Sequence, residues 1–196
     1  MKKIAIYGAG GFGKEVRGML DLQPDRYACA GYFDDHKAIA AILSPDQYED
    51  VLVAIANPAE RKKVVGAWSR KNVPFHSFIS PDVLLHPSVV IGKGSIICPG
   101  VKFTVDIRLG EFTIVNLNAT IGHDVVMGDF CSLMPSVNIS GNVKLGNRVF
   151  VGSGATILQG ITVGDDVVIG AGAVVRHDIP AGQTVVGVPA RVMVKR

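Results

Sequence analysis

The sequence predicts a small α/β domain followed by an all-β parallel helix built from short strands. Two observations predict this fold class. One is a six-residue repeat that begins at Ile79 and continues without a break to Ile169, and the other is a glycine-rich segment, Gly8 to Gly13, after a short apolar stretch. We therefore divide the chain into residues 1–78 and residues 79–196.

The repeat consists of two columns of residues. The first column is apolar throughout: Ile79, Leu85, Ile91, Ile97, Phe103, Leu109, Val115, Ile121, Met127, Leu133, Ile139, Leu145, Val151, Ile157, Val163 and Ile169. A second column lies four residues after each of these, from Val83 to Ala173, and contains no charged residue. A period of six does not fit an α-helix, but it fits strands separated by corners, three to a turn. Sixteen hexapeptides predict slightly more than five turns.

Glycine often follows the first column, at positions 92, 110, 122, 128, 146, 152, 164 and 170. We expect these glycines to supply the unusual backbone angles that tight corners require. No insertion interrupts the repeat, so the sequence predicts no protruding loop that could form a lid. Any active site must then be built from the turns themselves.

The first 78 residues predict a half-sized dinucleotide-binding fold. Strands are expected at 2–7, 28–33, 51–56 and 74–78, and helices after the glycine segment to about residue 22 and from 58 to about 71. The pattern Gly8-x-Gly10-x-x-Gly13 lies between the first strand and the first helix. Backbone N–H groups at such a helix start can bind phosphate.

The residues expected to bind a nucleotide lie where the predicted strands end. They are Gly8, Gly10, Gly11 and Phe12 in the glycine turn, Asp34 and Asp35 after the second strand, and Ala56 after the third. An acidic side chain about twenty residues beyond such glycines can bind a ribose hydroxyl. The glycines could instead make only a tight turn. A dehydrogenase is disfavoured because this domain is half a dinucleotide fold, so we expect a nucleotide sugar.

Composition excludes several classes of protein. A net charge of +3 is too small to indicate a nucleic-acid partner, and no apolar run approaches the roughly 18 residues of a membrane span. The three cysteines lack CxxC spacing, and histidines at the spacing of the turns are absent, so we expect neither disulfides nor a metal. The glycines that interrupt the basic N-terminus argue against a signal peptide. We expect a cytoplasmic protein.

Three segments are more distinctive than the glycine turn. They are VNLNATIGHD at 115–124, ISGNV at 139–143 and VGVPAR at 186–191. With these segments the whole chain resembles the sugar O/N-acyltransferases of the left-handed β-helix superfamily, and in particular the nucleotide-aminosugar N-acetyltransferases. The resemblance implies a left-handed helix, acetyl-coenzyme A as the acetyl donor, and a homotrimer with active sites between subunits.

His123 is the predicted general base. It is the one histidine between Ile91 and Ile169, and it occupies a corner beside Gly122. An amine or hydroxyl that attacks a thioester must lose a proton, and imidazole suits that task near neutral pH. The resemblance implies this role for His123, with Asp124 strengthening the base and the Gly141 N–H stabilising the oxyanion. A structural corner histidine bonded to Asp124 is the alternative.

The resemblance also implies where the substrates bind. Coenzyme A should lie along an edge between subunits and contact Ser132, Gly141, Ser153 and Ala171, with Arg191 available for its phosphates. Asn116 matches a position near the sugar, although it could equally be one member of an asparagine stack. Many relatives carry histidine at the positions of Phe12 and Ser132, so this chain would depend on His123 as its only base.

The sequence therefore predicts N-acetylation of a nucleotide-linked amino sugar by direct attack of the amine on the thioester. Two other functions stay open. One is O-acetylation of sialic acid or another glycan, which would need no nucleoside diphosphate site. The other is a β-helix scaffold without catalytic activity.

Overall fold

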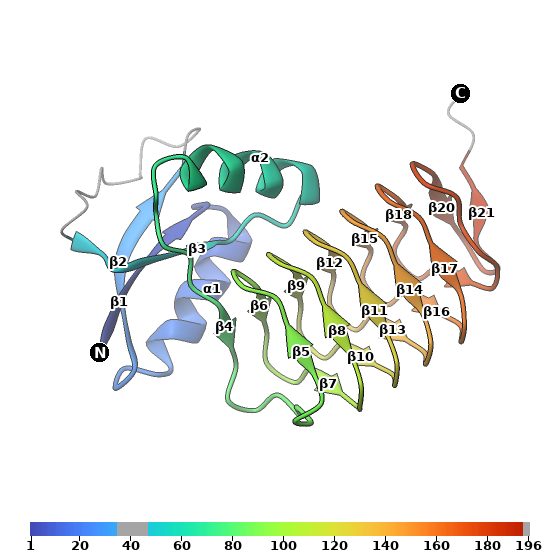
Figure 1. Ribbon diagram of the computed structural model, residues 1–196, viewed down its shortest axis with the longest axis horizontal. Coiled ribbons are helices and arrows are strands. Elements are labelled where there is room, and N and C mark those ends of the chain that lie inside the picture. Colours follow the sequence, from blue (N-terminus) through green and yellow to red (C-terminus); the bar gives the residue numbers. More distant parts are fainter. Residues whose placement is uncertain (35–46, 194–196) are drawn as a thin grey trace. The chain divides into compact units, whose positions relative to one another are not determined.

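The computed structural model describes residues 1–34 and 47–193. The chain forms two compact units, Met1–Phe78 and Ile79–Arg196 (Figure 1). The first is a three-stranded parallel sheet with helices, and the second is a β-solenoid, so the predicted fold class is confirmed. Neither helix in the described part of the chain is long and apolar enough to cross a membrane.

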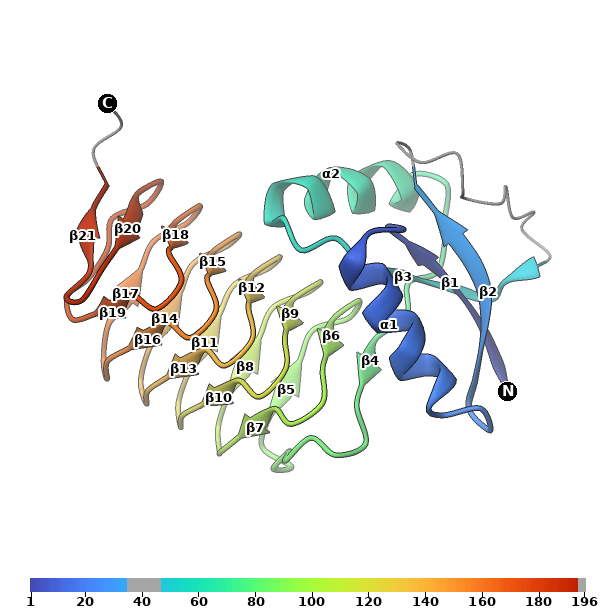
Figure 2. The ribbon, with the colours of Figure 1, turned by 180° about the vertical axis from the view of Figure 1, so that it is seen from behind.

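In the first unit the sheet has the strand order β2-β1-β3. Its elements are β1 (Lys2–Tyr7), α1 (Gly11–Asp21), β2 (Tyr27–Phe33), β3 (Asp50–Val53) and α2 (Pro58–Ser69), and Figure 2 shows α1 following β1. The indole of Trp68 packs edge-on against Tyr7 and Phe33, with ring centroids 5.1 and 4.7 Å apart, and so fixes α2 to the sheet.

The strand predicted at 74–78 is wrong in its extent. Phe75 makes only an isolated bridge to Val51, and Phe78 belongs to β4 (Phe78–Ile79), which pairs within the solenoid. Phe75 therefore pairs with the sheet of the first unit, whereas Phe78 pairs within the solenoid. The apolar composition of the segment does not reveal that its residues belong to two different sheets.

The solenoid has three sheets of parallel two-residue strands. The first sheet contains β7 (Lys102–Phe103), β10 (Thr120–Ile121), β13 (Asn138–Ile139), β16 (Thr156–Ile157) and β19 (Val174–Val175). The second contains β5 (Val90–Ile91), β8 (Arg108–Leu109), β11 (Val126–Met127), β14 (Lys144–Leu145) and β17 (Thr162–Val163). The third contains β4, β6 (Ile96–Ile97), β9 (Ile114–Val115), β12 (Ser132–Leu133), β15 (Phe150–Val151), β18 (Val168–Ile169), β20 (Thr184–Val186) and the antiparallel β21 (Arg191–Val192).

Both predicted columns form the core of the solenoid. From Ile97 onward their side chains are almost all below 5% exposed, and neighbouring turns pair residues eighteen apart, as Ile121 does with Ile139. After Val175 this spacing shortens to sixteen, since Val163 bridges Ile179 and Ile169 pairs with Val185. The third sheet therefore advances through six turns rather than slightly more than five.

The explanation predicted for the corner glycines is wrong. The left-handed backbone angles lie three residues after the first column, where Asp124, Phe130 and Arg148 have φ between 58° and 59°. The glycines one residue after the column are needed for another reason. A Cβ on Gly92 would lie 2.4 Å from the backbone of Gly110 in the next turn. These positions are glycine because the turns stack closely there.

Candidate active site

His123 lies at the corner between the first and second sheets, which we call the histidine corner (residues 122–124 and 140–142). Its side chain is half-exposed, and Nδ1 lies 2.8 Å from Oδ2 of Asp124. A carboxylate can only accept this hydrogen bond, so Nδ1 carries the proton and Nε2 has a free lone pair. The pair therefore orients an imidazole that can take a proton at Nε2.

Gly141 lies one turn beyond His123, where the eighteen-residue register places it. A Cβ built on Gly141 would stand 2.4 Å from Nε2 of His123, so the imidazole covers the space above this glycine. Within the described residues, the backbone N–H of Gly141 makes no hydrogen bond. A base therefore lies over a residue whose N–H is unpaired within the described residues, and such a pair of groups can serve acyl transfer through an oxyanion.

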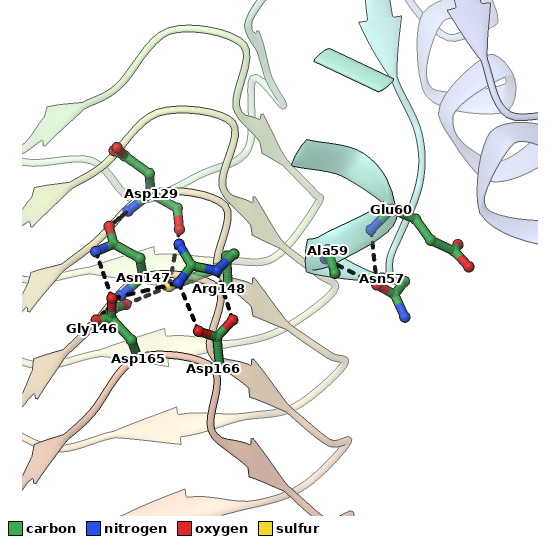
Figure 3. Close-up of polar contacts among 10 residues, drawn as sticks. Asn57, Ala59, Glu60, Asp129, Gly146, Asn147, Arg148, Asp165 and Asp166 are labelled. Atoms are coloured by element: carbon green, nitrogen blue, oxygen red, sulfur yellow. Dashed lines mark hydrogen bonds and ion pairs between the residues drawn. The ribbon is translucent and has the colours of Figure 1, made fainter. Parts of the chain in front are cut away.

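The corner between the second and third sheets has the same backbone but a different arrangement. We call it the ladder corner (residues 110–112, 128–130, 146–148 and 164–166). The N–H of Glu111 donates to Asp129 at 2.8 Å. The N–H of Asp129 donates to Asn147 and that of Asn147 to Asp165, both at 2.9 Å (Figure 3). Hydrogen bonds from the backbone N–H and then the side chain of Asn147 lower the pKa of Asp165.

The other predicted coenzyme contacts do not join the histidine corner within one chain. Ser153 and Ala171 are exposed at the third corner, after β15 and β18. Ser132 is fully buried in β12, so we leave it out of the contacts proposed below. Asn116, also at the third corner, is buried, and its side chain accepts the N–H of Leu117 at 2.7 Å.

A cavity of about 150 Å³ lies at the C-terminal end of the solenoid. Its lining includes the predicted Arg191 together with Arg176 and His177, which the sequence did not single out. His177 follows β19 as Gly141 follows β13, in the same column of the histidine corner. The shortened final turn brings these residues together, and a break in the six-residue period after Val175 was the signal for it.

The glycine turn of the first unit has the geometry of a tight strand-to-helix connection. A Cβ on Gly13 would lie 1.8 Å from the carbonyl oxygen of Gly8, so β1 and α1 approach too closely for any side chain there. Gly10 and Gly11 have open space, and the first turn of α1 has no side-chain cap and no acidic residue. Its N–H groups are therefore available to an anion.

Of the other predicted nucleotide contacts, Asp34 bonds to this turn. Asp34 accepts the N–H of Ala9 through Oδ2 at 2.8 Å, so one carboxylate oxygen holds the glycine turn. Ala56 follows β3 and is half-buried, and Phe12 is half-buried at the start of α1. Asp35 lies outside the described residues.

Comparison with known proteins agrees with both units. The family model for bacterial transferase hexapeptide repeats matches residues 124–159 and 142–177, and that for the PglD N-terminal domain matches residues 3–67. The acetyltransferase domain of PglB from Neisseria gonorrhoeae is 33% identical with a TM-score of 0.89, over 98% of this chain and 100% of that one. The chain belongs to this family of hexapeptide-repeat sugar acetyltransferases.

Other members of the family are similarly close. Perosamine N-acetyltransferase from Caulobacter crescentus, solved with CoA and GDP-perosamine, is 29% identical with a TM-score of 0.88, over 100% of this chain and 98% of that one. UDP-N-acetylbacillosamine N-acetyltransferase from Bacillus subtilis is 31% identical over 113 residues. That match spans 50% of this chain and 51% of the Bacillus enzyme.

Proposed function

We propose that the protein transfers an acetyl group from acetyl-coenzyme A to the amino group of a nucleotide-linked amino sugar. The observation that carries this proposal is that Nε2 of His123 lies over Gly141, whose backbone N–H makes no hydrogen bond within the described residues. Family membership supports it, because relatives that align with nearly the whole chain have been solved with acetyl-coenzyme A, or with CoA and GDP-perosamine.

The reaction follows from the groups at the histidine corner. The sugar amine attacks the thioester carbonyl while Nε2 of His123 accepts the proton that the amine loses. The N–H of Gly141 donates to the oxyanion, and Asp124 stabilises the imidazolium through Nδ1. When the carbonyl re-forms, the C–S bond breaks and the leaving thiolate takes the proton from His123, which returns the base to its neutral form.

No covalent acyl-enzyme is needed in this scheme. Cys131 is fully buried in the solenoid core, and its Sγ lies 3.0 Å from the carbonyl oxygen of Gly146. A thiol in that position cannot meet a thioester at the surface. The amine therefore attacks the donor directly.

The nucleotide of the acceptor and the coenzyme of the donor would bind at different places, while the sugar amine and the thioester meet at the histidine corner. We place the nucleotide at the start of α1, against Gly10, Gly11 and Phe12, with Asp34 and Ala56 at its border. We place coenzyme A along the column from Gly141 to His177, two turns or about 10 Å further, with its phosphates at Arg176 and Arg191. This direction uses the cavity at the end of the solenoid, whose charged lining consists of Arg176 and Arg191 together with Asp178.

A homotrimer is part of the proposal. Ser153 and Ala171 lie at a different corner of the solenoid from Gly141, so one chain cannot present all three to the same coenzyme. A neighbouring copy would bring its third corner to the histidine corner of the first. Each site would then be complete only between two copies.

The test is release of free thiol from acetyl-coenzyme A with UDP-, GDP- and dTDP-linked 4-amino-4,6-dideoxy sugars as acceptors. The proposal predicts turnover on one of them and an acetamido product. Turnover on sialic acid with silence on all nucleotide sugars would contradict it and favour the O-acetyltransferase. Silence on every acceptor would favour the scaffold.

A further inference from the structure

The buried face of α2 carries a charged residue. Its buried side chains, Pro58, Arg61 and Val65, have the spacing of one helical face, and Arg61 is 0% exposed. Arginine is among the residue types that are rarely buried completely. Its position in the middle of a packed face therefore calls for a specific use of the guanidinium.

Arg61 binds the chain segment that precedes its own helix. Among its contacts, Nη1 donates to the carbonyl oxygens of Ile55 at 2.5 Å and Ala56 at 3.2 Å, and its backbone N–H donates to that of Asn57 at 3.0 Å. Asn57 also caps α2, since its Oδ1 accepts the N–H groups of Ala59 and Glu60 (Figure 3). The guanidinium of Arg61 thus binds the two carbonyls that precede Asn57, whereas the bond to Asn57 is the first backbone hydrogen bond of α2 itself.

The segment between β3 and α2, residues 54–57, packs against the glycine turn. A Cβ on Gly8 would lie 2.7 Å from the carbonyl oxygen of Ala54 and 3.5 Å from Cγ1 of Ile55, so the two segments are in contact. Ala54 donates its N–H to Tyr7 at 2.8 Å, which joins β3 to β1 just before that turn. A displacement of residues 55–57 would therefore change the edge of the sheet where the nucleotide is placed.

We propose that Arg61 is a positioning residue for the nucleotide half of the acceptor. Its guanidinium holds the carbonyls of Ile55 and Ala56 in place beside the glycine turn and does not touch the substrate. The inference rests on the proposed function. The planar guanidinium suits this task because it can donate to both carbonyls from a fixed geometry, whereas a lysine ammonium is a single flexible point of charge.

The experiment compares Arg61→Met and Arg61→Lys with Val65→Ala, which removes buried volume from the same face of α2 without touching the connection. Calorimetry measures the dissociation constants of UDP, GDP and dTDP, and kinetics give KM for the acceptor and for acetyl-coenzyme A. Arg61→Met should weaken nucleoside diphosphate binding and raise the acceptor KM by about ten-fold, because hydrogen bonds from a charged donor are lost. Arg61→Lys should recover part of this loss.

The KM for acetyl-coenzyme A and kcat at saturating acceptor should not change in any of the three variants, and Val65→Ala should lower Tm while binding nucleoside diphosphate as the wild type does. Unchanged nucleotide affinity in Arg61→Met, an equal loss in Val65→Ala, or no nucleotide binding by the wild type would each overturn the inference. If the wild type binds a nucleoside diphosphate but acetylates no nucleotide sugar, the proposed function fails, and the binding constants alone decide the role of Arg61.

Discussion

The histidine corner and the ladder corner are built on the same backbone and differ in which side chains follow one another at eighteen-residue spacing. In the ladder corner, Asp129, Asn147 and Asp165 each accept the N–H of the residue one turn below. In the histidine corner the residue one turn beyond Gly141 is Gln159, and its side chain does not accept the Gly141 N–H. The Gly141 N–H is therefore unpaired within the described residues.

The difference indicates how a repetitive fold acquires a reactive site. The ladder corner uses polar side chains to satisfy backbone donors, and this contributes to stability. In the histidine corner the absence of a side chain on Gly141 leaves space for the imidazole of His123, and the Gly141 N–H, which no side chain of the next turn accepts, is available, we propose, to the oxyanion. Stability and chemistry are then located in different corners, so substitutions in the two corners should have separable effects.

The largest effect is expected for His123→Ala. Loss of the general base should lower kcat by about 10²–10⁴-fold in the thiol-release assay, with the solenoid still folded. His86→Ala is the matched control, because His86 is exposed and its side chain bonds only to Ser88 among the described residues. Activity of His123→Ala within three-fold of the wild type would exclude the histidine corner as the reaction site.

Asp124→Asn should have a smaller effect. The Asp124 carboxylate orients His123 from a half-exposed position, where such pairs are worth little, so kcat should fall by only about ten-fold. The KM for acetyl-coenzyme A should stay the same. A loss as large as that of His123→Ala would mean that Asp124 itself contacts the reacting groups.

In the ladder corner, Asn147→Ala should affect stability and not rate. It removes the acceptor of the Asp129 N–H and the donor to Asp165, which should lower the unfolding free energy by about 1 kcal/mol and Tm by about 2–4 °C. Calorimetry measures the shift, and kcat should equal that of the wild type. A lower kcat with unchanged Tm would remove the distinction between the two corners.

The smallest effect concerns acid stability. The pKa of Asp165 is lowered from 3.8 in the folded protein, so its stabilising contribution is present above pH 3.8 and is lost as pH falls through the lowered value. Asp165→Asn keeps an acceptor but does not titrate. The Tm difference between the wild type and Asp165→Asn, measured from neutral pH to below 3.8, should therefore shrink on acidification; a constant difference would contradict this assignment.

Much of the solenoid could be predicted because its columns repeat without a break. The last turn could not, since the spacing between Ile169 and Val185 is sixteen and a search at period six ends before it. The role predicted for the corner glycines, to supply unusual backbone angles, was wrong. Close approach between successive turns is a property of stacking, and a single hexapeptide carries no information about the turn above it.

The candidate site shows the same division. That His123 and Gly141 stack follows from their spacing of eighteen. The unpaired N–H of Gly141 becomes apparent only by contrast with Asp129, Asn147 and Asp165, whose roles depend on hydrogen bonds between turns. Arg61 was missed because a helical arginine ordinarily predicts an exposed face, and only packing reveals that it is buried.

The most direct test of the central claim compares an added methyl group at one glycine in each corner. The three atoms nearest to an added methyl group on Gly141 all belong to the ring of His123, whereas Gly146→Ala would meet Asp165 and the backbone of the next turn. Because the methyl group of Gly141→Ala would displace the imidazole while the N–H stays, we expect its kcat to fall by about 10²-fold with little change in Tm, and Gly146→Ala to lower Tm while kcat is unchanged. Equal kcat values for Gly141→Ala and the wild type would contradict the claim that acyl transfer occurs at the histidine corner.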